Sequence, residues 1–166
     1  MTSLRPIICP TKSCRMDIFS ASKRSSIMSK IRSVDTKAEV RLRKELFALG
    51  YRYRKNVRKL PGSPDIVLPK HGYAIQVRGC FWHAHDCRRA HRPESNRDYW
   101  NPKLARNVAR DKISDEALSA AGWRLRVVWE CEIASRSGLA GVVSMIVSDL
   151  AHERRRTLLR AVANSC

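Results

Sequence analysis

The chain has 166 residues, 43% of them hydrophobic, which predicts one globular domain with its own core rather than disorder. Its 33 Lys and Arg residues stand against 15 Asp and Glu residues, so the formal net charge is +18 at pH 7. Such an excess favours a polyanionic partner, and nucleic acid is the usual one. An anionic membrane is the weaker alternative, because the sequence has no apolar run of transmembrane length and no separate cationic amphipathic anchor.

The six cysteines are not interpreted as disulfide partners. The apolar stretch 7–9 is too short for the core of a secretory signal peptide. Cys80 and Cys87, with His85 between them, have the spacing of metal ligands. We therefore expect a reducing cytoplasm. Residues 1–21 are predicted to be a poorly ordered extension, and 22–166 a single domain.

The first part of this domain is predicted to be helical and basic. A short helix is expected over 22–31, and Thr36 with Glu39 forms a capping box for a second helix that ends at Gly50. The apolar stripe of that helix consists of Leu42, Leu46 and Leu49. Thirteen Lys and Arg residues and three acids lie within 23–59, which favours a phosphate-facing surface over a merely solvated one.

Three strands are expected next. Alternating apolar and basic residues predict a half-exposed strand over 51–57. After a turn at 61–64, a hairpin is expected to pair 65–68 with 73–77 across a second turn at 69–72.

The last third of the chain is predicted to be helix, strand and helix. Asn101 and Pro102 are typical of a helix start, and Gly122 of its end. An apolar strand follows over 123–129, and a final helix over 139–162. The order α-β-β-β-α-β-α predicts an α/β fold, with a mixed central sheet flanked by helices.

A long basic segment, 78–100, precedes the helix at Asn101, and segments of this kind are usually functional or pinned by a metal. It begins G-C-F-W-H-A-H-D-C, in which two thiols and an imidazole lie within eight residues. The candidate zinc ligands are Cys80, His85, Cys87 and Cys131. Such a closed site would be a structural zinc that staples the segment to the sheet. His91 competes for a ligand position, and the alternative is a set of buried cysteines without metal.

Asp65 and His83 are the candidates for chemistry. Asp65 follows Pro64 at a strand start, and the next strand ends in Q-V-R over 76–78, which resembles the P-D…(D/E)-x-K layout of nucleases. A carboxylate there suits Mg²⁺, although a Pro-Asp pair alone often only begins a turn. His83 can take a proton from water, or it can be a loop histidine bound to a carbonyl.

Four large side chains are candidates for contact with bases. Phe81, Trp82 and Trp100 lie on the basic segment, where exposed rings favour stacking on bases or wedging between them. Core packing is the alternative for each ring. Met28 is a further wedge or a core residue.

From about residue 22 to 133 the sequence resembles the very-short-patch-repair (Vsr) mismatch endonucleases. The resemblance lies in R-S-x-I-M-S-K-I, P-D-I-V, G-C-F-W-H, Y-W…K…N-x-x-R-D and G-W-R-L…V-W-E-C. It implies a restriction-endonuclease-like core and a monomeric enzyme that nicks double-stranded DNA 5′ to the thymine of a T:G mismatch left by deamination of 5-methylcytosine. It also implies a bacterial, nucleoid-associated protein with no membrane contact, and mismatch-repair proteins as further partners.

The resemblance assigns roles residue by residue. Asp65 and the backbone carbonyl of Val77 match the Mg²⁺ ligands, His83 the residue that handles the water proton, Glu39 an outer-shell acid, and Asp111 the support of the histidine. The four candidate zinc ligands match the family's zinc set. Phe81, Trp82 and Trp100 match intercalating aromatics, and Met28 enters from the other groove.

Arg78 departs from the family pattern, in which its position is usually histidine or aspartate. Arginine is neither a base nor a metal ligand. It is expected either to hold the scissile phosphate or to weaken a second Mg²⁺ by repulsion, and Gln76 is a candidate neutral oxygen ligand. Two other hypotheses remain: a zinc-stabilised DNA-binding protein with weak or no cleavage, and a cutter of unmodified or otherwise damaged DNA.

Overall fold

The computed structural model describes residues 22–23, 26, 29, 34–90 and 96–163. The elements are α2 (Lys37–Ala48), β1 (Arg54–Lys55), β2 (Ile66–Leu68), a 3-10 turn (Pro69–His71), β3 (Tyr73–Arg78), α3 (Arg97–Ala120), β4 (Arg124–Trp129) and α4 (Arg136–Ala163). The strands form one sheet in the order β1-β2-β3-β4. The first three are antiparallel and β4 is parallel to β3, which confirms the predicted mixed sheet flanked by helices.

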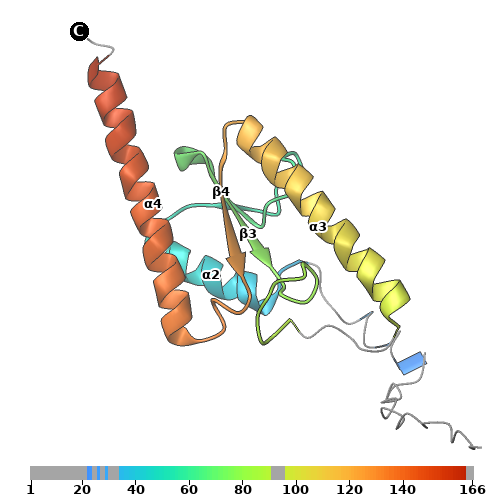
Figure 1. Ribbon diagram of the computed structural model, residues 1–166. Coiled ribbons are helices and arrows are strands. Elements are labelled where there is room, and N and C mark those ends of the chain that lie inside the picture. Colours follow the sequence, from blue (N-terminus) through green and yellow to red (C-terminus); the bar gives the residue numbers. More distant parts are fainter. Residues whose placement is uncertain (1–21, 24–25, 27–28, 30–33, 91–95, 164–166) are drawn as a thin grey trace, which may run out of the picture.

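The two long helices lie on opposite sides of the sheet (Figure 1). On the α4 side, apolar residues of α2, β2, β3, β4 and α4 form the main core cluster, and Tyr73 and Ile75 are its members from β3. Each fully buried Leu or Ile in it contributes roughly 1.5–3 kcal/mol. Successive side chains of a strand point to opposite faces, so Gln76 and Arg78 point toward α3. The interface between the sheet and α3 is therefore partly polar.

The predicted capping box of α2 is confirmed. The Thr36 hydroxyl accepts from the Glu39 backbone N–H at 3.3 Å, and the Glu39 carboxylate accepts from the Thr36 N–H at 3.3 Å. Leu42 and Leu46 are fully buried. Leu49 was predicted to share their stripe, but it is 56% exposed, because the helix ends before it and the chain turns at Gly50.

Several predicted boundaries are wrong. In 51–57 only Arg54 and Lys55 pair with β2, because Asn56 has a φ of 49° and ends the extended run. Helix α3 begins at Arg97 instead of 101, with Pro102 inside it. Pro102 has no N–H to give to the carbonyl of the fourth residue before it. The extra turn is held by Trp100, whose ring packs on Phe81.

The final helix begins at Arg136 instead of 139. Gly138 lies in its first turn, where a Cβ atom would come within 2.1 Å of the Glu132 carbonyl oxygen. Because the Glu132 carbonyl oxygen lies so close to this position, only glycine, which has no Cβ atom, fits at residue 138.

Some expectations fall where the structure describes little. Ser22, Lys23, Ser26 and Ser29 of the predicted helix at 22–31 are helical. The rest of that helix, apart from residues 22–23, 26 and 29, and the predicted extension 1–21 lie outside the described residues. Across the described part of the chain, no helix combines the length and apolar character needed to cross a bilayer.

Candidate active site and metal-ligand cluster

The sheet topology brings the candidate residues to one edge. Because β2 and β3 are antiparallel, Asp65 at the start of β2 lies beside the end of β3. Because β3 and β4 are parallel, their carboxyl ends lie together, and Arg78 pairs in register with Trp129. The segment from Gly79 onward and the turn after β4 therefore leave the sheet side by side.

Asp65 is held at this edge by a backbone hydrogen bond. Its Oδ2 atom accepts from the Val77 N–H at 2.7 Å. Burial raises the pKa of its carboxyl to about 6, and the charge of Glu39 acts in the same direction, while the bond from Val77 and the charges of Arg43 and Arg78 act against it. A half-buried carboxyl that is costly to ionise and lies at a sheet edge is a candidate cation ligand.

The Glu39 carboxylate is already fully engaged. It accepts from the Asp35 N–H at 3.0 Å, from the Thr36 N–H and hydroxyl, and from the Arg43 guanidinium at 2.6 Å. Arg43, 4% exposed, also bonds Asp35 at 2.6 Å. Glu39 therefore caps α2 and acts on Asp65 through its charge.

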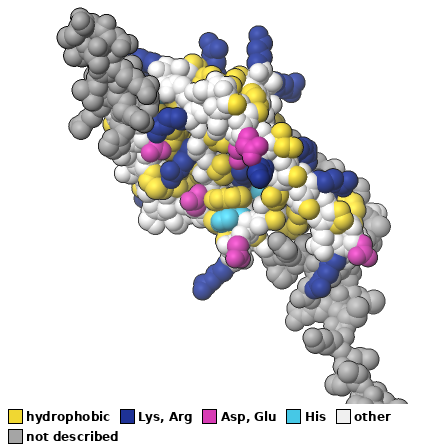
Figure 2. Space-filling model, turned by 45° about the horizontal axis from the view of Figure 1, so that its top comes forward, with side chains coloured by type: hydrophobic (Ala, Val, Ile, Leu, Met, Phe, Trp, Pro, Cys, Tyr) yellow, Lys and Arg dark blue, Asp and Glu magenta, His cyan; other side chains and the backbone are white. Residues whose placement is uncertain are grey.

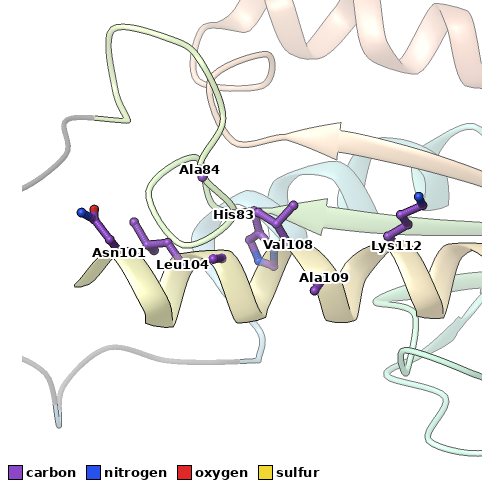
Figure 3. A pocket seen from close by; sticks show the side chains of 8 residues that line it. His83, Ala84, Asn101, Leu104, Val108, Ala109 and Lys112 are labelled. Atoms are coloured by element: carbon purple, nitrogen blue, oxygen red, sulfur yellow. The ribbon is translucent and has the colours of Figure 1, made fainter. Parts of the chain in front are cut away.

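His83 is held by Asp111 of α3. Its Nδ1 atom lies 2.5 Å from Asp111 Oδ2. A carboxylate oxygen accepts, so Nδ1 carries the proton and Nε2 keeps a free lone pair. Together with α3 side chains, His83 lines an open pocket of about 620 Å³ (Figure 3). The histidine therefore faces open space beside α3, while Asp65 is not among the residues that line this pocket.

Arg78 is buried, and one of its terminal nitrogens is paired with two side chains. It is 8% exposed, and its Nη2 atom donates to Gln76 Oε1 and to Asp115 Oδ1, both at 2.6 Å. Its Nε atom lies 3.8 Å from Asp111 Oδ2. The Gln76 oxygen, expected as a neutral metal ligand, accepts from Arg78, which uses one of its two lone pairs.

The candidate zinc ligands converge. The ligand atoms of Cys80, His85, Cys87 and Cys131 all lie within 4.8 Å of one another, and Cys131 Sγ is 3.6 Å from His85 Nδ1. The Trp129 ring stacks on the His85 ring at 4.1 Å between centroids. Three thiols and one imidazole are the donor number and type that a structural zinc takes.

The three thiols differ in acidity. Burial raises the pKa of Cys80 to about 12, with the neighbouring thiols adding to the rise. It also raises the pKa of Cys131. For Cys87, burial is outweighed by hydrogen bonds from the Arg89 backbone and from its neighbours, so its pKa falls to about 7. A divalent cation would offset the mutual repulsion of three thiolates.

The predicted DNA-contacting aromatics form one cluster. Ring centroids are 5.0 Å apart for Phe81 and Trp82, 5.3 Å for Phe81 and Trp100, and 6.1 Å for Trp82 and Trp100. All three rings are partly exposed. Met28 and His91 lie outside the described residues.

Sequence reasoning missed three residues of this region: Arg43, Lys103 and Asp115. The Lys103 ammonium lies 5.1 to 5.6 Å from the ring centroids of Trp82, Tyr99 and Trp100. Asp115 stands four residues after Asp111 on α3, a spacing that puts both on one face. That spacing was the available signal for Asp115.

The surface combines opposite charges with apolar atoms. Figure 2 shows a face on which Lys and Arg side chains project outward at several places, acidic side chains lie both at the edge and further in, and histidine lies among hydrophobic side chains near the centre. The projecting cations, together with the net charge of +18, suit a polyanionic partner.

A half-buried carboxyl at the sheet edge, a histidine bonded to an aspartate and a strongly basic composition are features expected of an enzyme that acts on DNA. Residues 16–89 match the family model described as DNA mismatch endonuclease Vsr. The chain is 46% identical over 121 residues to the Type II nicking enzyme V.NmeAIP of Neisseria meningitidis, covering 73% of this chain and 86% of that relative. It is 36% identical over 123 residues to the DNA mismatch endonuclease Vsr of Escherichia coli, with coverage of 74% and 79%. The chain belongs to the Vsr endonuclease family.

Proposed function

We propose that the protein nicks one strand of double-stranded DNA 5′ to the thymine of a T:G mismatch that arises from deamination of 5-methylcytosine. The single observation that carries the proposal is the pairing of His83 with Asp111 at the sheet edge that also holds Asp65. Membership of the Vsr endonuclease family supports DNA as the substrate. A restriction-endonuclease-like core, a monomeric state and a location at the bacterial nucleoid are parts of the same proposal.

The chemistry assigned to the site is hydrolysis by water. His83 Nε2 takes a proton from the attacking water, whose oxygen bonds to phosphorus as the bond from phosphorus to the 3′ oxygen breaks. The leaving 3′ oxygen takes a proton from solvent, so the products are a 3′ hydroxyl and a 5′ phosphate. Asp65 and the Val77 carbonyl are proposed to hold Mg²⁺, which supplies Lewis-acid charge at the phosphate when bound. Asp111 keeps the histidine in the tautomer that this step needs.

The cysteine cluster is proposed to hold a structural Zn²⁺. Its four donors leave no position for water, so it has no part in the cleavage step. It would tie the segment from Gly79 to Ala90 to the turn after β4. That segment carries Phe81, Trp82 and His83. The zinc would therefore hold the two aromatic rings and the general base His83 in fixed positions relative to each other.

The aromatic cluster is proposed to open the base stack beside the mismatch, where unstacking costs least. Trp82→Ala is expected to weaken binding of a T:G duplex about 5- to 150-fold, because stacking of a base on an aromatic ring contributes about 1–3 kcal/mol. Binding can be measured by fluorescence anisotropy. Phe47→Ala is the control, since Phe47 is 55% exposed on α2 and lies outside the cluster. Equal affinities of Trp82→Ala and the parent protein would remove the wedge role.

A substrate panel tests the proposed specificity. Zinc-loaded protein with Mg²⁺ is incubated with duplexes that carry T:G, T:A or C:G at one position in varied flanks. We expect T:G duplexes to be nicked at least about 100-fold faster than the matched duplexes, because the free energy needed to unstack the bases is lowest at the mismatch. Equal cutting of T:A duplexes would favour an endonuclease for unmodified DNA. Mismatch binding without a nick in any flank would favour a non-cutting DNA-binding protein.

A further inference from the structure

We infer that Arg78 is a positioning residue, whose buried guanidinium fixes Asp111, and through it the ring of His83, instead of contacting the scissile phosphate. The inference rests on the proposed nicking function and concerns the arginine that ends β3. The observations that carry it are the partners of Arg78, its burial and the net charge around it.

One carboxylate oxygen connects the arginine to the histidine. Asp111 Oδ2 lies 2.5 Å from His83 Nδ1 and 3.8 Å from Arg78 Nε. A displacement of Arg78 would therefore change the electrostatic attraction that holds the Asp111 carboxylate. Because that carboxylate is the partner of His83 Nδ1, the His83 ring would move with it. Asp111 and Asp115 are like charges four residues apart on α3, and such a pair is unfavourable unless a cation lies between them. Arg78 is that cation.

The guanidinium is itself anchored from two sides. Both protons of Nη2 are used, one by Gln76 Oε1 and one by Asp115 Oδ1. Gln76 Nε2 lies 3.5 Å from the Gly62 carbonyl oxygen, and a Cβ atom on Gly62 would come within 2.7 Å of that same nitrogen. The turn that leads to Asp65 is therefore packed against Gln76, which is linked to His83 through Arg78 and Asp111.

The local charge argues against a phosphate ligand. Arg78 is 8% exposed, and the two aspartates that contact it carry one more negative charge than it neutralises. A phosphate that approached Nη2 would have to displace a carboxylate or an amide oxygen at 2.6 Å. Burial of an arginine with such partners is typical of a structural cation, because leaving a buried guanidinium unpaired is costly.

The test compares Arg78→Met and Asp115→Asn with Asp149→Asn. Asp149 is a matched control, because it is 33% exposed against 28% for Asp115 and also pairs with arginines, but on α4. Single-turnover nicking of T:G duplex at saturating protein, dissociation constants from 50 to 200 mM salt, and the His83 ring N–H signal in NMR spectra are recorded for each. Asp115→Asn keeps the size of the side chain, so it remains informative if Arg78→Met does not fold.

The expected result is a split between rate and affinity. Nicking falls roughly 100-fold in Arg78→Met and about 10-fold in Asp115→Asn, because small misplacements of a catalytic group have effects of this size. DNA affinity and its salt dependence stay unchanged, and the combined variant is no slower than Arg78→Met. The His83 N–H signal broadens in both variants and persists in Asp149→Asn.

Two results would overturn the inference. One is weaker DNA binding by Arg78→Met with a salt slope smaller by about one, which is the mark of a lost phosphate contact. The other is an unchanged His83 signal in both variants. Failure of the parent protein to nick any duplex would instead count against the proposed function, while the NMR and binding measurements would still decide the role of Arg78.

Discussion

Asp65→Asn is expected to abolish nicking and, at neutral pH without Mg²⁺, to stabilise the protein. Loss of the proposed cation ligand should lower the nicking rate at least about 1,000-fold, since a bound metal contributes several kcal/mol at a phosphoryl oxygen. The gain in stability follows from the pKa of Asp65, which burial raises from 3.8 to about 6. A rise of this size corresponds to about 3 kcal/mol of cost for the ionised carboxylate in the folded state.

The sign of the effect sets its pH range. Because the folded-state pKa lies above the ordinary value, the folded protein binds the Asp65 proton more tightly than the unfolded chain does. The cost is complete above about pH 6 and vanishes below about pH 4. The neutral amide of Asp65→Asn carries no such cost. The variant should therefore be more stable than the parent by about 1–3 kcal/mol at pH 7.5, and the difference should close at pH 4.

Urea unfolding of zinc-loaded protein in Mg²⁺-free buffer measures this difference. Mg²⁺ should stabilise the parent protein and leave Asp65→Asn unchanged, because a ligand stabilises only the state that binds it. Glu116→Gln is the control, since Glu116 is 67% exposed on α3 and its substitution should change stability by less than about 0.5 kcal/mol. An Asp65→Asn protein that is less stable at pH 7.5, or that still nicks at the parent rate, would contradict the assignment.

Cys131→Ser is expected to lose the bound metal, destabilise the protein and abolish nicking together. Cys131 is the one member of the cluster that comes from the turn after β4, so its removal disconnects the segment after β3 from the sheet. A lost structural metal should lower the free energy of unfolding by roughly 3 kcal/mol or more. The same segment carries Trp82 and His83, so preference for T:G duplex should be lost as well.

Metal analysis, thermal unfolding and Co²⁺ substitution test this prediction. The parent protein should hold one Zn²⁺, and the Co²⁺ form should show the visible bands of tetrahedral thiolate coordination. Cys9→Ser is the control, because Cys9 belongs to no proposed ligand set. A Cys131→Ser protein with unchanged melting temperature and nicking rate would show that the four side chains hold no structural metal.

The sequence predicted the local features of this site better than its long-range pairs. The capping box at Thr36 and Glu39 follows from residue type at fixed spacing, and so does the hairpin that sets Asp65 beside Val77. Convergence of Cys131 on the other ligands needed only that β4 lie parallel to β3. In each case the feature is determined by interactions between residues a few positions apart or by the pairing of two strands.

Other features depend on contacts that no local pattern encodes. The bond between Arg78 and Asp115 joins residues 37 apart and requires the rotation of α3 relative to the sheet. Helix α3 begins at Arg97, earlier than predicted, because the Trp100 ring packs on Phe81 of the preceding loop. This tertiary contact outweighs the preference of proline, here Pro102, for the first turn of a helix. The Lys103 ammonium lies over the ring of Trp82, from the loop after β3, and over that of Trp100, from α3. The sequence does not show that these two rings come together.

A strand-resolved nicking assay tests the central proposal most directly. A duplex with one T:G mismatch carries a different fluorophore on each strand and is treated with the parent protein or Asp65→Asn across a Mg²⁺ titration. We predict one product, from the thymine strand only, that ends in a 3′ hydroxyl immediately before the mismatched thymine, grows with Mg²⁺ and is absent with Asp65→Asn. Cuts in both strands, or the same product from Asp65→Asn, would contradict the proposal.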